Sequence, residues 1–176
     1  MHHVRFSPVE AHLLAAAASD RSVILYDTRE VGALRRVVMN LKTNVIAWNP
    51  MEAMVFTVGS EDYNMYAFDL RKLDRPVNVQ MDHAGAVVDL DYSPTGREIA
   101  SASYDKTVRL WSTDAGRSRE VCLFTFLITL LFILPSQVYH TKRMQRLTAV
   151  AWSLDNKYVI SASDEMCLRV WKARAR

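Results

Sequence analysis

Four copies of one pattern recur along this chain of 176 residues, and this repeat limits the folds that it can adopt. In each copy an aromatic residue precedes Ser or Asn, a second aromatic closes an apolar stretch, and an acidic residue lies six positions before that second aromatic. The landmarks are Phe6, Trp48, Tyr92 and Trp152, then Tyr26, Phe68, Trp111 and Trp171, then Asp20, Asp62, Asp105 and Glu165. The first two gaps are 42 to 44 residues for every landmark, and the last is 60. A period in this range is typical of chains built from stacked structural units.

The third copy is the most complete. Pro94-Thr95-Gly96 predicts a turn, and Ile99, Val108 and Leu110 are strand-forming residues. With its closing Trp111, this pattern resembles the WD-repeat family of β-propellers. The resemblance implies an all-β fold, namely a partial WD-repeat β-propeller with about four blades of a seven-bladed ring. Further blades are expected on the N-terminal side, because the first copy begins only five residues before Phe6.

The same resemblance implies a hydrogen-bonded chain inside the third blade, formed by His83, Ser101, Asp105 and Trp111. A His and an Asp together could also form a catalytic pair, but no nucleophile motif accompanies them here. We therefore assign the four residues a structural role, because a satisfied buried network fixes one packing arrangement.

The other copies depart from this set. Ala16 and Val58 replace the Ser, Glu165 replaces the Asp, and Arg143 replaces the His. Those blades are expected to depend more on apolar packing than the third blade does.

The predicted repeats cover residues 1–29, 40–71, 82–114 and 139–172, within one partial propeller domain spanning 1–176. The long last gap coincides with an apolar insert at residues 122–138, which is expected to lie outside the fold. Removing 17 residues there restores a gap of 43 for the landmarks of the last copy. The insert therefore interrupts an otherwise regular period.

Three interpretations of the insert remain open. The insert could be a transmembrane helix, although its apolar part, Val121 to Leu134, is shorter than the roughly 20 residues that such a helix needs. It could instead be a buried strand or helix, or it could be a retained intron in the gene model, since Val codons begin with GT and Gln137 can be encoded by CAG. Uninterrupted coverage of Glu120 to Val138 in mature transcripts would exclude the intron.

Composition excludes several other classes of protein. Half of the residues are hydrophobic and 23% are charged, with a net charge of +3, so the chain is neither a disordered tail nor a strongly basic protein. Cys122 and Cys167 are too few for a disulfide framework, which favours a reducing compartment. Met1 to Pro8 lacks the apolar stretch of a signal peptide. No hydrolase, kinase, zinc-protease or phosphate-loop motif occurs, so we predict no enzyme activity, catalytic residue, cofactor, metal or small-molecule substrate.

Some stretches are more specific than the repeat itself. They are Asn44 to Ala53, Glu61 to Tyr66, Met81 to His83, Arg117 to Val121 rejoining Tyr139 to Gln145, and Ser163 to Met166. Together they resemble the suppressor-of-fibrillarin type of WD-repeat protein. This resemblance implies a nuclear, nucleolar scaffold that helps to mature small-subunit ribosomal RNA in the small-subunit processome, with processome proteins and a small nucleolar ribonucleoprotein as partners. It also implies an alternative function, that of a substrate receptor for cullin-4 ubiquitin ligases.

Two short motifs bear on the alternative function. Tyr26-Asp27-Thr28-Arg29 and Phe68-Asp69-Leu70-Arg71 resemble the aromatic-Asp-x-Arg box of cullin-4 receptors. The resemblance implies that Asp27, Arg29, Asp69 and Arg71 form the site that binds the ligase adaptor. The planar guanidinium group suits this role because it makes several directional hydrogen bonds. The same residues could instead lie on ordinary solvated loops.

Basic residues near the insert form a candidate RNA contact. They are Arg117, Arg119, Lys142, Arg143 and Arg146. With the insert removed they would gather at one blade entrance, where they could neutralise phosphates or simply be solvated. A membrane protein anchored by Val121 to Leu134 is a competing class, and we predict no membrane partner.

Overall fold

The computed structural model describes residues 1–113, 138–141 and 144–173. These residues form four antiparallel sheets, called blades 1 to 4 in chain order. Blade 1 contains β1 (His3–Phe6), β2 (Leu13–Ala17), β3 (Ser22–Asp27) and β4 (Ala33–Val38). Blade 2 contains β5 (Thr43–Trp48), β6 (Val55–Ser60), β7 (Met65–Asp69) and β8 (Asn78–Gln80). Blade 3 contains β9 (Val87–Tyr92), β10 (Glu98–Ser103), β11 (Val108–Ser112) and β12 (Val138–Tyr139), and blade 4 contains β13 (Leu147–Trp152), β14 (Tyr158–Ser163) and β15 (Cys167–Lys172).

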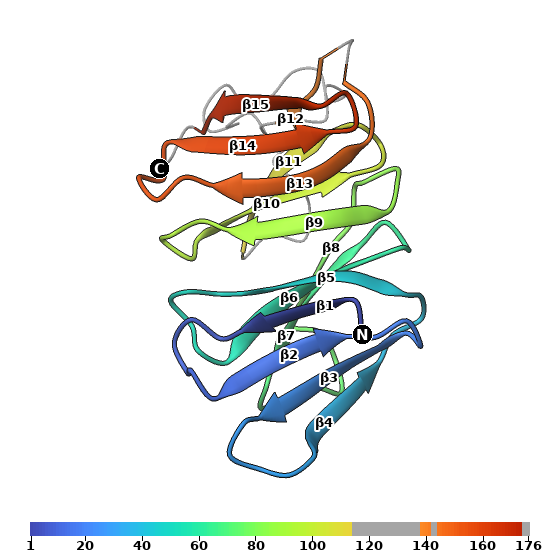
Figure 1. Ribbon diagram of the computed structural model, residues 1–176, viewed down its shortest axis with the longest axis vertical. Helices are drawn as coiled ribbons and strands as arrows, with labels where there is room; N and C mark the ends of the chain where they lie inside the picture. The colour runs from blue at the N-terminus through green and yellow to red at the C-terminus, as the bar shows by residue number, and fades with distance from the viewer. Residues whose placement is uncertain (114–137, 142–143, 174–176) are drawn as a thin grey trace, which may run out of the picture.

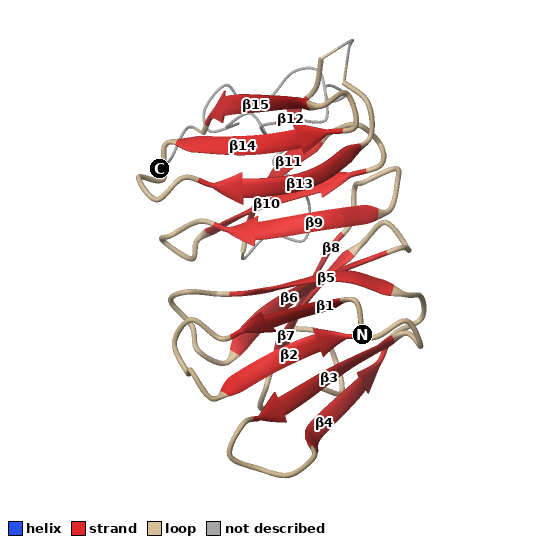
Figure 2. Cartoon of the chain, viewed as in Figure 1, coloured by secondary structure: helices blue, strands red, loops and turns tan. Residues whose placement is uncertain are grey.

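The blades follow one another in space as they do in the chain, from blade 1 at the bottom of Figure 1 to blade 4 at the top. The first strand of each blade contacts the first strand of the next, so β1, β5, β9 and β13 lie in sequence. Figure 2 shows strands and loops throughout the described part of the chain and no helix there. The chain is therefore a partial β-propeller, and the predicted fold class is confirmed.

The four closing aromatics occupy equivalent places. Tyr26, Phe68, Trp111 and Trp171 all lie in the third strand of their blade. They pair across the ladder with Leu14, Phe56, Ile99 and Val159 of the second strand. The period read from the sequence thus corresponds to one blade per repeat.

The acidic landmarks lie in the turns between the second and third strands. The residue after each of them has a positive φ: 65° at Arg21, 73° at Tyr63, 66° at Lys106 and 58° at Met166. Residues other than Gly rarely adopt this backbone conformation, so the turn needs additional hydrogen bonds to stabilise it. In the first three blades the carboxylate accepts a backbone N–H two residues later, as Asp62 does from Asn64 at 3.1 Å.

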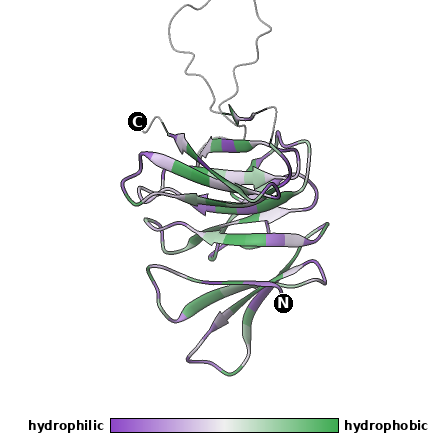
Figure 3. Ribbon diagram, turned by 45° about the horizontal axis from the view of Figure 1, so that its top comes forward, coloured by the Kyte–Doolittle hydropathy of each residue, from purple (hydrophilic) through white to green (hydrophobic). Residues whose placement is uncertain are grey.

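Apolar layers between neighbouring blades form the core, and Figure 3 shows that apolar residues (green) lie mainly in the strands. Leu25 of blade 1 belongs to the same buried cluster as Trp48 and Phe56 of blade 2. Two further clusters lie between blades 2 and 3 and between blades 3 and 4. Blades 2 and 3 therefore bury apolar side chains against a neighbour on both faces, and blades 1 and 4 do so on one face.

The predicted repeats each contain the first three strands of a blade, while β4, β8 and the first residue of β12, Val138, lie between them. Residues 122–137 of the predicted insert lie outside the described residues, so its three interpretations stay predictions. Val138, which the sequence placed at the end of the insert, lies in β12 and pairs with Arg109. The chain thus re-enters blade 3 at the last residue of the predicted insert.

Candidate docking site

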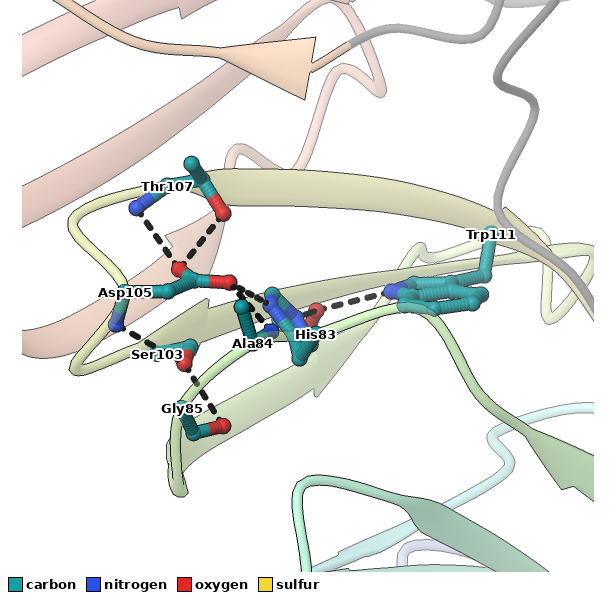
Figure 4. A network of polar contacts seen from close by, with 8 residues as sticks. His83, Ala84, Gly85, Ser103, Asp105, Thr107 and Trp111 are labelled. Carbon is teal, nitrogen blue, oxygen red and sulfur yellow. Dashed lines mark hydrogen bonds and ion pairs between the residues drawn. The ribbon is translucent and has the colours of Figure 1, made fainter. Parts of the chain in front are cut away.

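Hydrogen bonds link His83, Ser101, Asp105 and Trp111 inside blade 3 (Figure 4). The Nε1–H group of Trp111 donates to the hydroxyl oxygen of Ser101 at 2.7 Å. The same oxygen lies 2.7 Å from Nε2 of His83, and Nδ1 of His83 lies 2.8 Å from Oδ2 of Asp105. A neutral His83 satisfies every partner, with the Ser101 hydroxyl donating to Nε2 and Nδ1–H donating to Asp105.

Asp105 is the most highly connected residue of this network. Its Oδ2 also accepts the backbone N–H of Ala84, and its Oδ1 accepts both the N–H and the hydroxyl of Thr107. Burial disfavours the charged carboxylate, but the hydrogen bonds from His83 and Thr107 outweigh this effect and hold the pKa of Asp105 well below its usual value. The side chain of His83 is fully buried and that of Asp105 nearly so, and neither has a free polar atom facing solvent.

As far as residues 1–113, 138–141 and 144–173 show, the other blades contain only parts of this network. In blade 4 the Nε1–H group of Trp171 donates to Ser161 at 2.8 Å, and Arg169 pairs with Glu165. Blades 1 and 2 have Ala16 and Val58 at the serine position, both fully buried. Apolar packing therefore takes the place of the hydroxyl in those two blades.

The first arginine box forms a closed ion pair. The carboxylate of Asp27 accepts the backbone N–H of Arg29 at 2.9 Å and its Nε–H at 3.0 Å, while Nη2 of Arg29 lies 2.7 Å from Oδ2. The hydrogen bonds from the Arg29 side chain are the main cause that lowers the pKa of Asp27 to about 2. The Arg29 side chain remains 63% exposed, so its outer edge can still reach a partner.

The second arginine box is open. Oδ1 of Asp69 accepts the backbone N–H of Arg71 at 2.8 Å. Among the described residues, the guanidinium group of Arg71 makes no hydrogen bond or ion pair. Its hydrogen-bond donors are therefore available to a binding partner.

The two boxes lie at the same place in adjacent blades, where the third strand ends: Asp27 is the last residue of β3 and Asp69 the last of β7. The backbone N–H of Thr28 donates to His12, and that of Leu70 donates to Met54, so each box rests on the turn between the first and second strands of its own blade. The structure thus brings the boxes to one rim of the propeller. Blades 3 and 4 have Ser112 and Lys172 where the boxes have Asp.

The candidate RNA contact lies largely outside the described residues, which include neither Arg117 and Arg119 nor Lys142 and Arg143. Arg146 is described, and its guanidinium carbon lies 5.6 Å from the centre of the Tyr104 ring. This cation–π contact places Arg146 on the surface of blade 3. The proposed cluster of five basic residues stays a prediction.

Two half-buried acidic residues, Asp89 and Asp91, were not predicted from the sequence. Oδ2 of Asp89 accepts the backbone N–H of Val150, and Oδ2 of Asp91 accepts that of Trp152, both at 2.8 Å. Burial raises the pKa of both carboxyl groups. Two charges at alternate positions of the apolar strand β9 were the available signal, because such residues share one face of a strand.

The described residues contain neither a cluster of metal ligands nor a membrane-spanning helix. No group of three or more His, Cys, Asp or Glu side chains there could hold a metal ion. No helix within those residues has the length and apolar character needed to cross a membrane.

Comparison with known proteins identifies the repeats. The family model for the WD domain, G-beta repeat, matches residues 74–112 and 135–172. The protein "DDB1- and CUL4-associated factor 13" of Danio rerio is 55% identical over 172 residues, and that of Homo sapiens is 50% identical. "Protein SOF1" of Saccharomyces cerevisiae is 42% identical over 172 residues.

Each of these matches covers 98% of this chain but only 32% to 35% of the relative. The chain therefore spans about a third of the length of the relatives that it matches. The similarity extends over blades with and without the hydrogen-bonded network, so it is not confined to the general WD pattern. The matched repeats and the four blades identify the chain as a WD-repeat β-propeller segment, and along nearly its whole length it is similar to DDB1- and CUL4-associated factor 13 and to SOF1.

Proposed function

We propose that this chain is a non-enzymatic docking scaffold. The observation that carries this proposal is that hydrogen bonds from Ser101, Thr107 and the backbone N–H of Ala84 occupy the polar atoms of the His83–Asp105 pair. A general base must reach the proton that it abstracts, and this pair is buried inside one blade. The propeller rim, by contrast, presents exposed arginines to other molecules.

We further propose that the process served is maturation of small-subunit ribosomal RNA in the nucleolus. The partners would be proteins of the small-subunit processome and its small nucleolar ribonucleoprotein. Two observations support this proposal. The chain is similar to SOF1 along nearly its whole length, and its most specific stretches, such as Asn44 to Ala53, resemble the suppressor-of-fibrillarin type of WD-repeat protein. Purification of the complete gene product from nucleoli should recover small nucleolar RNA and processome proteins. Recovery of neither would contradict this proposal.

The alternative function is attachment to a cullin-4 ubiquitin ligase as its substrate receptor. Relatives 50% to 55% identical have names that state association with DDB1 and CUL4. Two observations favour this function here: both boxes lie on one rim, and the guanidinium group of Arg71 has no partner among the described residues. We propose that the DDB1 adaptor binds this rim through Arg29 and Arg71.

The test is binding of purified DDB1 to the complete gene product. Changing both Arg29 and Arg71 to Ala should lower the affinity at least about tenfold, because directional hydrogen bonds from arginine commonly dominate an interface. The matched control is the double variant Arg97→Ala and Lys157→Ala, which removes two exposed positive charges from blades 3 and 4. An equal loss in both double variants would indicate general electrostatic attraction and would contradict the specific role of the boxes.

A further inference from the structure

A small apolar hollow lies between blades 1 and 2, beside both arginine boxes. Its volume is about 180 Å³. Four leucines of blade 1 line one side, Trp48 and Leu70 of blade 2 line the other, and Arg35 lies at its border. Leu70 is the third residue of the second box, and one of the four leucines, Leu13, pairs across the ladder with Asp27 of the first box.

The hollow has a buried floor and an accessible mouth. Leu25 and Trp48 are almost completely buried, whereas Leu13 and Leu70 are half-buried and Leu34 is 40% exposed. Sites for small-molecule ligands usually have volumes of about 300–1,000 Å³. A hollow of this size instead suits one aliphatic side chain, and a side chain that fills such a hollow is a common anchor of protein interfaces.

The charge around the mouth favours an acidic partner. Within the described part of the chain, the side chain of Arg35 makes no hydrogen bond or ion pair, and the same is true of the Arg71 guanidinium group. The carboxylate of Asp27 is already engaged by Arg29, and that of Asp69 accepts the Arg71 backbone N–H. The guanidinium donors of Arg35 and Arg71 are thus available to carboxylates of a partner.

We propose that this hollow receives an aliphatic side chain of the DDB1 adaptor, from a segment whose neighbouring carboxylates pair with Arg35 and Arg71. This inference rests on the proposed binding of DDB1 to the rim, and it adds an apolar anchor to the contacts of the boxes. Burying one aliphatic side chain there removes it from water, and the surrounding arginines set its orientation through directional hydrogen bonds. The boxes and the hollow then act as one continuous docking surface.

The test uses the complete gene product, purified DDB1 and two substitutions in β4. Leu34→Asp places a charge at the mouth, and Arg35→Glu repels an acidic segment. Each should weaken DDB1 binding about tenfold or more, as expected for the loss of an interface anchor. The matched controls are Val38→Asp, at an exposed position of the same strand, and Arg36→Glu, at the neighbouring position on the opposite face of β4. Both controls should bind DDB1 like the wild type, and unchanged circular dichroism and melting temperature should show that all four variants fold.

Three outcomes decide between the proposals. If the box variants and the hollow variants all lose affinity while the controls do not, both proposals are supported. If the box variants lose affinity but Leu34→Asp and Arg35→Glu bind like the wild type, the hollow is not an anchor site and the inference is overturned, while the proposed function stands. If the folded wild-type protein does not bind DDB1, the inference falls together with the function on which it rests.

Discussion

The hydroxyl group of Ser101 in blade 3 hydrogen-bonds to two buried rings, those of His83 and Trp111. Replacing Ser101 should therefore lower the free energy of unfolding more than replacing any other residue of the network. Changing Ser101 to Ala leaves both Nε1–H of Trp111 and Nε2 of His83 without a partner in a fully buried site. Each buried polar group without a partner costs about 1–3 kcal/mol. We therefore expect the free energy of unfolding to fall by about 2–4 kcal/mol, as measured by urea denaturation of the purified protein.

Blade 4 provides the matched control. Within the described residues, the hydroxyl group of Ser161 accepts one hydrogen bond, from Trp171, whose side chain is only half-buried. Ser161→Ala should therefore cost about 1 kcal/mol or less. Equal losses in the two variants would show that the hydrogen bonds of His83 add nothing to the stability of blade 3.

Asp105 should make stability depend on pH in the acidic range. Its folded-state pKa lies below the usual value of about 4, because the hydrogen bonds to its carboxylate outweigh the effect of burial. A carboxyl group with a lowered pKa stabilises the fold above its unfolded pKa, and this contribution is lost as the pH falls towards the folded pKa. Unfolding measured from pH 5 down to pH 3 should show a steep loss for the wild type and a shallower one for Asp105→Asn. Parallel curves would contradict this assignment.

At the scale of single residues, the sequence predicted those side chains whose partners lie within one repeat. Ser101, Asp105 and Trp111 are close in the chain, and the acidic landmark persists because it supports a turn with positive φ. The different states of the two boxes were not predictable. Asp27 holds the guanidinium group of Arg29 whereas Asp69 does not hold that of Arg71, and this difference depends on side-chain rotamers that the shared motif does not encode.

At the scale of strands, side chains replace backbone pairing between neighbouring blades. Nδ1 of His3 accepts the N–H of Ile46 at 3.2 Å, and Asp89 occupies the equivalent place two blades later, accepting the N–H of Val150. The first strands of adjacent blades therefore stay aligned without forming a common sheet. Each such bond satisfies a backbone donor that would otherwise be buried.

This arrangement gives a prediction for Asp89. Asp89→Asn retains an oxygen for the Val150 N–H and removes a charge whose burial is unfavourable, as the raised pKa of Asp89 indicates. The variant should lie within about 1 kcal/mol of the wild type. Asp89→Ala removes the acceptor and should lower the free energy of unfolding by about 2 kcal/mol. Urea titrations of the two variants would refute the role of this bond if their losses were equal.

Strands were predictable because turn residues and strand-forming residues alternate within each repeat. The contacts between blades were not, because they join positions about 43 to 61 residues apart, such as Ile46 with His3 and Val150 with Asp89. The docking hollow has the same origin: Leu13, Leu34 and Leu70 belong to different segments and meet only when two blades pack. A period in the sequence specifies each blade, but it does not specify which side chains meet between two blades.

At the scale of the whole molecule, four blades packed in a row have two outward faces. The outward face of blade 4 is apolar: Ile160, Leu168 and Val170 are 37%, 75% and 63% exposed. The ladder pairs Ile160 with Val170 and Ala162 with Leu168, so these side chains share one face, opposite to the face with Val159 and Trp171 that packs in the core. Apolar faces of this kind mark contacts with another surface.

The isolated 176-residue chain should therefore associate through this face. Sedimentation velocity should show species larger than a monomer at micromolar concentrations, because the apolar face and the outer edge of β15, which pairs with no other described strand, can both pair with a second copy. Leu168→Lys with Val170→Lys should shift the distribution towards the monomer by placing two charges on the face. The control pair Leu154→Lys and Met166→Lys changes residues at least as exposed, but these lie in turns outside the sheet face, and it should leave association unchanged. A wild-type chain that sediments as a monomer and melts in one sharp transition would show that this face needs no cover, and the blades would then form a stable unit by themselves.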